Sequence, residues 1–232
     1  MSHIGRRQVV AGVAGAGALG ALGLATAGHA EAAGRPTIQL GSTGSNVTYL
    51  QQRLNYVGYW CGGADGVFGA QTQQAVYALQ KAWGLYRDAV VGPNTWGVVG
   101  SNQRRPARYG PGYRIEIDKA RQLLLVVWGN SVRYTLNTST GSNQPFYSWG
   151  RWYNGQTPSG SFSVFRKVNG WSNDALGSLY RPHFFNGAIA IHGATSIPPY
   201  NASHGCCRLS TSAQDMLIAG GYLTIGRSVA VF

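Results

Sequence analysis

The chain is short of charged side chains, and above all of acidic ones. Only 11% of its 232 residues are charged, and these comprise 7 Asp or Glu against 19 Lys or Arg. An average globular protein has about 25% charged residues, so a charged cytosolic helix bundle is excluded. The 34 glycines and the aromatic content of 12% instead favour a loop-rich, β-leaning, exported protein.

The basic residues are not gathered into a nucleic-acid-binding stripe. Although the net charge is +12, Arg104, Arg105 and Arg108 form the only cluster, in a segment that reads as a linker. Proteins that bind nucleic acid concentrate such charge on one face or helix. We therefore expect no nucleic-acid partner and favour another anionic polymer, such as one of the cell wall.

Long apolar runs are absent after residue 32. Residues 1–32 contain Arg6-Arg7 followed by an uncharged, Gly/Ala-rich run from Val9 to Ala27. This pattern predicts an export signal of the twin-arginine type, with an uncleaved anchor as the alternative. Its removal leaves a basic mature chain with no membrane span, located at the cell wall or the outer side of the membrane.

Residues 38–100 carry a helical pattern. Val47, Leu50, Leu54 and Val57 are spaced by three, four and three positions, which places them on one face of a helix that Ser45 or Asn46 can cap. A second helix is predicted from about Gln71 to Trp83, and a third one begins near Gly92. We expect a small three-helix unit with a marginal core.

The pattern changes after a Pro- and Gly-containing linker over 101–112. Residues 113–118 alternate with period two, 122–128 are strongly apolar, and Gly129-Asn130 suits a two-residue hairpin turn. Further strands are predicted over 161–168, 188–192, 222–225 and 228–232, polar loops before 157, and one helix over 211–219. The predicted fold is therefore α+β and multidomain, with a mostly β domain over 113–232.

The residues best suited to catalysis are concentrated in the stretch SHGCCRL, residues 203–209. A cysteine with a histidine in reach, here Cys206 with His192 or His204, is the minimum requirement for thiolate catalysis. Gly205 allows a sharp turn that can aim backbone N–H groups at an oxyanion. Two structural alternatives stay open: a buried or disulfide-bonded Cys206, and a zinc site formed by the same three side chains.

Both halves also resemble known families. The first half is similar to the three-helix peptidoglycan-binding domain of bacterial wall enzymes through LGSxG, LQxxL, GY, DGxFG and VGPxTW. The second half resembles the L,D-transpeptidase catalytic domain, also called YkuD-like, through STG, TPxG, FNG, IHG and SHGCxRL, in that order. The resemblance covers essentially all of 113–232 and implies catalysis.

The resemblance also implies roles for individual residues. Cys206 is the expected nucleophile and His192 its base, and the Gly193 carbonyl is expected to hold the other ring nitrogen. His204 is expected to orient substrate or thiolate, with simple packing as the alternative. Backbone N–H groups of Gly205 and Cys206 are the expected oxyanion donors.

Substrate-binding residues are expected nearby. Arg208 suits a substrate carboxylate, with a structural arginine as the alternative. The other candidates for binding or lining the cleft are Ser203, Tyr180 and Phe184. A further histidine, His183, is expected to be packed and not catalytic.

The implied reaction is acyl transfer between peptidoglycan stem peptides, forming 3→3 cross-links through a thioacyl enzyme. The alternatives are an L,D-carboxypeptidase, with water as acceptor, and a non-catalytic wall-binding protein. No cofactor and no metal are expected, and the partners are peptidoglycan stem peptides and glycan, bound by a monomer. If Cys206 stays free, Cys61 and Cys207 are left as a hypothetical disulfide pair between the domains.

Overall fold

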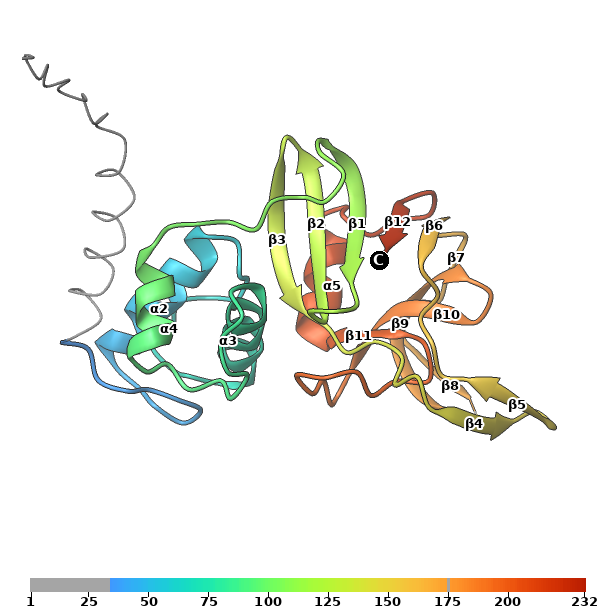
Figure 1. Cartoon of the computed structure of the whole chain (residues 1–232), viewed down its shortest axis with the longest axis horizontal. Coiled ribbons are helices and arrows are strands. Elements are labelled where there is room, and N and C mark those ends of the chain that lie inside the picture. Colours follow the sequence, from blue (N-terminus) through green and yellow to red (C-terminus); the bar gives the residue numbers. More distant parts are fainter. Residues whose placement is uncertain (1–33, 175) are drawn as a thin grey trace, which may run out of the picture.

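A computed structural model describes residues 34–174 and 176–232, which form a helical domain beside a β domain (Figure 1). The predicted export signal over 1–32 lies outside the described residues. Within the described ranges, no helix has the length and apolar character needed to cross a membrane.

The helical domain contains three helices, α2 (Ser45–Tyr56), α3 (Ala70–Ala82) and α4 (Pro93–Gly100). Their apolar faces meet in one core, as the spacing predicts, and its fully buried members include Leu50, Leu54 and Leu79. The expected side-chain cap is not formed, because Gly44 occupies the N-cap position of α2 and no side chain bonds there.

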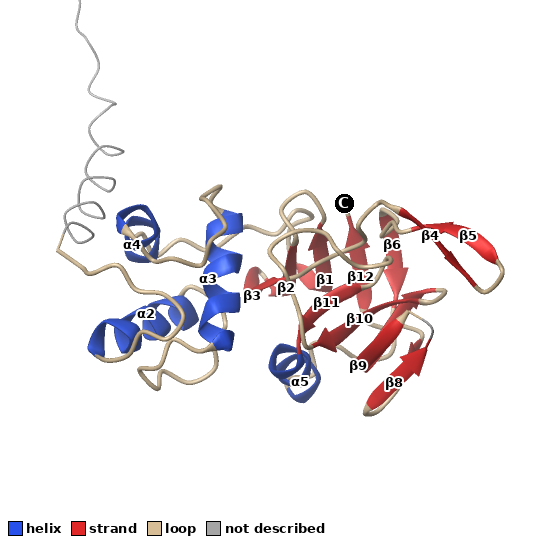
Figure 2. Cartoon of the chain, turned by 90° about the horizontal axis from the view of Figure 1, so that it is seen from below, coloured by secondary structure: helices blue, strands red, loops and turns tan. Residues whose placement is uncertain are grey.

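The β domain is built on two five-stranded sheets, a two-stranded hairpin and the helix α5 (Thr211–Ala219). The first sheet has the order β3 (Ser131–Asn137), β2 (Leu123–Gly129), β1 (Gly112–Asp118), β12 (Ser228–Val231) and β6 (Gly160–Ser163). The second sheet has the order β11 (Cys207–Ser210), β10 (Ile189–Ala194), β9 (Gly177–Asn186) and β7 (Arg166–Lys167), and β8 (Trp171–Asp174) also pairs with β9. The hairpin consists of β4 (Pro145–Ser148) and β5 (Arg151–Asn154) and projects at the far end of the molecule from the helical domain (Figure 2).

Several predicted strands differ from the structure. Residues 222–225 form a turn and not a strand, because the chain must reverse between α5 and β12. The predicted strand over 161–168 is divided into β6 and β7, which belong to different sheets. The loops expected before residue 157 include the β4–β5 hairpin, whose side chains are mostly exposed and therefore lack an alternating apolar pattern.

Strand β2 has both faces buried, and this joins the two domains. Leu123, Leu125 and Val127 belong to the core of the helical domain, whereas Leu124 and Val126 belong to the core of the β domain. Successive side chains of a strand point to opposite faces, so the continuous apolar run of β2 serves two cores at once. Both views place α3 next to β3, the edge strand of the first sheet that pairs with β2 (Figures 1 and 2).

A buried polar cluster reinforces this interface. The side-chain nitrogen of Lys81, on α3, donates to the carbonyl oxygens of Gln122, at 2.9 Å, and Thr138, at 3.1 Å, and also to Oδ1 of Asn137. The side-chain amide of Asn137 donates in turn to Oε1 of Gln74. The domains are therefore held together by packing and hydrogen bonds, in addition to the covalent linker.

The hypothetical disulfide between Cys61 and Cys207 is not formed. All three cysteines are free thiols. Cys61 lies in the core of the helical domain and Cys207 in the core of the β domain, so each is enclosed by a different set of side chains.

Candidate active site

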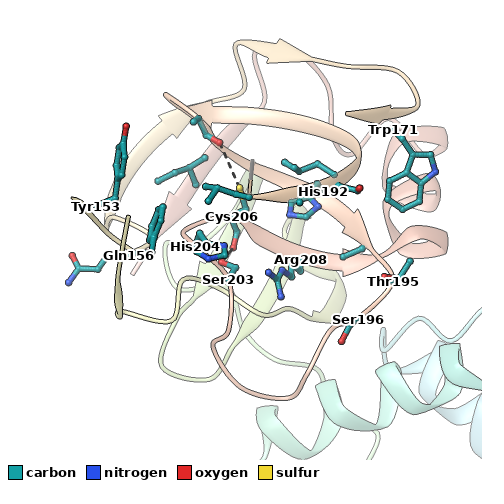
Figure 3. A pocket seen from close by; sticks show the side chains of 18 of the residues that line it. Tyr153, Gln156, Trp171, His192, Thr195, Ser196, Ser203, His204, Cys206 and Arg208 are labelled. Atoms are coloured by element: carbon teal, nitrogen blue, oxygen red, sulfur yellow. Dashed lines mark hydrogen bonds between the residues drawn. The ribbon is translucent and has the colours of Figure 1, made fainter. Parts of the chain in front are cut away.

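A pocket of about 680 Å3 opens at the edge of the second sheet. Strands β10 and β11, the β4–β5 hairpin, β8 and residues 194–196 surround it, and Figure 3 shows side chains that line it. The lining includes five of the predicted site residues and several aromatic ones: His192, Ser203, His204, Cys206, Arg208, Phe146, Trp149, Tyr153 and Trp171.

Strand register brings Cys206 and His192 to the same face. Strands β10 and β11 are parallel, with Ile191 opposite Cys207 and His192 opposite Arg208. Ile191 and Cys207 point into the buried core of the β domain. Because side chains alternate along a strand, Cys206, Arg208 and His192 point to the other face, into the pocket (Figure 3). The predicted nucleophile and base therefore share one site.

The His192 ring is fixed by its own chain. Its Nδ1 lies 2.8 Å from the carbonyl oxygen of Gly193, and the ring is buried. A carbonyl oxygen only accepts hydrogen bonds, so Nδ1 carries the proton and Nε2 of the neutral ring is the acceptor nitrogen. This tautomer suits a base that takes a proton at Nε2.

The Cys206 thiol differs from the other two in its exposure. Its Sγ lies 3.4 Å from the backbone nitrogen of Ala190, whose N–H points at the sulfur, and 3.7 Å from the carbonyl oxygen of Ala188. The residue is half-buried, whereas Cys61 and Cys207 are fully enclosed. Burial raises the pKa of Cys61 to about 12 and also raises the pKa of Cys207. Cys206 is thus the thiol suited to reaction.

The turn before Cys206 is held by hydrogen bonds within the chain. Gly205 has φ of +137°, and a Cβ atom there would lie 3.0 Å from the carbonyl oxygen of Gln156. The Gly205 N–H donates to Oγ of Ser203 at 3.0 Å, and that hydroxyl donates to the Cys206 carbonyl oxygen at 2.5 Å. Oγ1 of Thr157 donates to the Gly205 carbonyl oxygen at 2.6 Å.

These bonds bear on two of the predicted site residues. The Gly205 N–H, predicted as an oxyanion donor, already has Ser203 as its acceptor, which leaves the Cys206 N–H as the candidate of the predicted pair. Ser203 is buried and shapes the turn through both of its hydroxyl contacts. The hydroxyl of Thr157, which the sequence motif contains but which received no role, supports the same turn.

His204 lies at the mouth of the pocket and is exposed. Its ring meets the ring of Phe146 edge-on, with centroids 4.7 Å apart. Phe146, on β4, stacks in turn on Tyr153 of β5, with an interplanar angle of 13°. His204 therefore connects the turn over 203–206 to the β4–β5 hairpin, whose aromatic side chains have no predictive pattern in the sequence.

Of the three remaining candidates, only Arg208 faces the pocket. Its guanidinium makes no hydrogen bond or ion pair with any residue in the described part of the chain, and its backbone is held by Ser139. Tyr180 and Phe184 do not line the pocket, which corrects the expectation. Tyr180 packs beside Gly193 and donates to Asp215 at 3.2 Å, and Phe184 is buried beneath Cys206.

Similarity to known proteins decides the family. Residues 43–99 match a family described as putative peptidoglycan binding domain, and residues 112–226 match the L,D-transpeptidase catalytic domain, YkuD. A crystal structure of an L,D-transpeptidase from Xylanimonas cellulosilytica is 42% identical, with a TM-score of 0.82, and the match covers 85% of this chain and 98% of that one. The chain belongs to the L,D-transpeptidase family.

The helical domain of this L,D-transpeptidase family member is also similar to segments of two further proteins. A spore cortex-lytic enzyme of Halalkalibacterium halodurans is 46% identical over 56 residues, and an N-acetylmuramoyl-L-alanine amidase of Mycobacterium tuberculosis is 42% identical over 52 residues. These matches cover 24% and 22% of this chain but only 17% and 13% of the two relatives' own length. Within the described ranges, no three His, Cys, Asp or Glu side chains gather as a metal site.

Proposed function

We propose that this protein is a cysteine-dependent L,D-transpeptidase that forms 3→3 cross-links between peptidoglycan stem peptides. One observation carries the proposal: strands β10 and β11 direct His192 and Cys206 into the same pocket of a YkuD domain. The peptidoglycan-binding domain packed against that domain supports a polymeric wall substrate.

In the first half-reaction, Nε2 of His192 takes the proton of the Cys206 thiol. The thiolate attacks the carbonyl carbon of the third residue of a donor stem, and the oxyanion accepts a hydrogen bond from the Cys206 N–H. The C–N bond to the terminal D-amino acid then breaks, and its nitrogen leaves with the proton from His192. A thioester to Cys206 remains.

In the second half-reaction, an amine of a neighbouring stem attacks the thioester carbonyl. His192 removes a proton from the attacking nitrogen, the C–S bond breaks, and the Cys206 sulfur regains a proton.

Arg208 holds a stem carboxylate through its bidentate fork, because its guanidinium reaches the pocket and makes no bond to the described residues. Water in place of the amine would give L,D-carboxypeptidase activity.

The cell wall is the expected place of action. The two domains share the core around β2, so a glycan-bound helical domain would hold the catalytic pocket at the polymer. Export by a twin-arginine type signal would bring the chain there.

Mass spectrometry of products from a defined disaccharide-tetrapeptide tests the function. We expect a cross-linked dimer that has lost one terminal D-amino acid, and a thioacyl adduct on Cys206 after brief mixing. Cys206→Ala should abolish both, whereas Cys61→Ala should retain them, since that thiol is buried in the other domain. Release of tripeptide without any dimer would identify a carboxypeptidase instead, and turnover by Cys206→Ala would refute the mechanism.

A further inference from the structure

A second groove, of about 480 Å3, lies between the two domains. It shares residues 194–196 with the catalytic pocket, so this short loop is a common wall of both cavities. Figure 3 shows Thr195 and Ser196 at the side of the catalytic pocket that faces a helix of the helical domain. The opposite wall of the groove is α3, which contributes Ala70, Gln71, Gln73, Gln74 and Tyr77.

The groove is lined by neutral side chains, most of which can form hydrogen bonds, and its apolar members are Ala70, Ala194, Ile197, Pro198 and Pro199. Side-chain amides come from α3, hydroxyls come from residues 195–196 and 210–212, and one aromatic ring comes from Tyr77. No charged side chain is among the described residues that line it. The catalytic pocket differs, because Arg208 gives it a cation.

Two of the α3 amides hold the domains together. Oε1 of Gln71 accepts a hydrogen bond from Ser210 at 2.8 Å, and Gln74 accepts one from Asn137. Gln73 and Tyr77, four positions apart on the same helical face, are only half-buried. Neither side chain makes a hydrogen bond within the described ranges, so both are available to a ligand.

We infer that this groove binds the glycan strand of peptidoglycan, and the inference rests on the proposed function. Stem peptides carry free carboxylates and amines, which call for charged partners, and the groove offers none. Amino-sugars present neutral hydroxyl and acetamide groups, which match amide and hydroxyl side chains, and an apolar ring face, which matches tyrosine. One substrate thus spans both cavities, with its stem at Cys206 and its sugars against α3.

A pair of donor substrates tests this assignment. One is the disaccharide-tetrapeptide and the other is the same tetrapeptide without sugars, each assayed with wild type, Gln73→Ala and Tyr77→Leu. We expect each variant to lower kcat/KM on the sugar-bearing donor about fivefold to tenfold, the effect of one lost contact of roughly 1 kcal/mol. On the sugar-free donor, kcat/KM should stay within about twofold of wild type, because this donor has no sugar contact to lose. Matched controls are Gln52→Ala and Tyr56→Leu, exposed residues of α2 outside the groove.

The outcomes separate this inference from the proposed function. An equal fall on both donors, or no fall on either, overturns the groove assignment while leaving the chemistry intact. If wild type turns over neither donor, the proposed function fails, and titration of the Cys206→Ala chain with an N-acetylglucosamine oligomer still decides the groove. Binding that Tyr77→Leu weakens supports the inference, whereas binding unaffected by Tyr77→Leu, or no binding, contradicts it.

Discussion

The side-chain nitrogen of Lys81 lies 2.9 Å from the carbonyl oxygen of Gln122, and this pair joins the helical domain to the β domain. Lys81 is buried, and its remaining contacts are a second carbonyl oxygen and an amide oxygen. No carboxylate in the described residues pairs with it. The buried amino group therefore has only neutral acceptors, and nothing offsets the cost of burying its charged form.

The stability of the protein should depend on pH through Lys81. Burial lowers the pKa of Lys81 to about 6, whereas the unfolded chain keeps a lysine pKa of about 10.4. Between these values the unfolded state binds the extra proton, so the free energy of unfolding should rise with pH. Chemical denaturation at pH 7 and pH 9 should show this rise, and Lys81→Met should reduce it. The exposed Lys167→Met is the control, and an equal rise in both variants contradicts the assignment.

A methyl group at Gly193 should disturb the catalytic base. A Cβ atom there would lie 2.9 Å from Cδ1 of Tyr180 and 3.0 Å from Cα of Thr211, and the Gly193 carbonyl holds the His192 ring. We expect Gly193→Ala to cost about 1–3 kcal/mol of stability, since overpacked sites typically lose that much. It should also shift the pH–rate profile of cross-linking. Gly63→Ala, with open space at its Cβ, should change neither quantity.

Only one thiol should react in the native protein. Burial raises the pKa of Cys61 and Cys207, whereas Cys206 lines the open pocket. Iodoacetamide should therefore modify Cys206 alone before unfolding, and unfolding without reductant should release three thiols. Peptide mapping by mass spectrometry checks both steps. Labelling of native Cys206→Ala at a comparable rate would show that the enclosed thiols are accessible.

Much of the fold could be predicted because local patterns decide it. The period of α2 and α3, the alternation of β1 and the Gly129-Asn130 turn are local signals, and each element lies within one or two residues of its predicted position. The elements that were missed lack such a local signal. Strand β9 pairs with β7, β8 and β10, but buried and exposed side chains do not alternate along it with period two, and the side chains of the β4–β5 hairpin are mostly exposed.

The site was predicted through its reactive residues and missed in its supports. Cys206, His192 and Arg208 share the pocket because β10 and β11 pair in parallel, a pairing that the spacing of the motifs does not specify. The Gly205 N–H was predicted as an oxyanion donor because nothing in the sequence indicates that the Ser203 hydroxyl lies close enough to accept its hydrogen bond. Phe146 was missed because it lies 58 positions from His204 and meets it only through the fold.

Acid should destabilise the β domain through His183. The ring is buried between β9 and α5, with Nδ1 3.0 Å from the Arg181 carbonyl oxygen, and burial lowers its pKa below the usual 6.5, aided by nearby Lys167 and Arg181. Because the pKa of His183 is lower in the folded protein than in the unfolded chain, the neutral ring contributes its full share of stability above about pH 6.5, the unfolded pKa. That contribution is lost as the pH falls through the folded pKa. The free energy of unfolding should therefore drop between pH 7 and pH 5 in wild type. His183→Gln should lower it at both pH values but flatten the drop, and an unchanged slope in that variant refutes the assignment.

The contact between His204 and Phe146 predicts how the hairpin contributes to catalysis. Because the rings meet edge-on at 4.7 Å, removing either one frees the β4–β5 hairpin from the catalytic turn. An aromatic pair of this kind contributes about 0.5–1.5 kcal/mol, so His204→Ala and Phe146→Ala should each reduce kcat/KM about twofold to tenfold, mainly through KM. His204→Phe separates packing from chemistry, since it keeps a ring against Phe146 but removes both nitrogens. Near-normal kcat in His204→Phe is expected if His204 acts by packing. A loss of kcat as deep as that of His192→Ala would instead assign its imidazole to proton transfer, and steady-state kinetics on the defined disaccharide-tetrapeptide distinguishes these results.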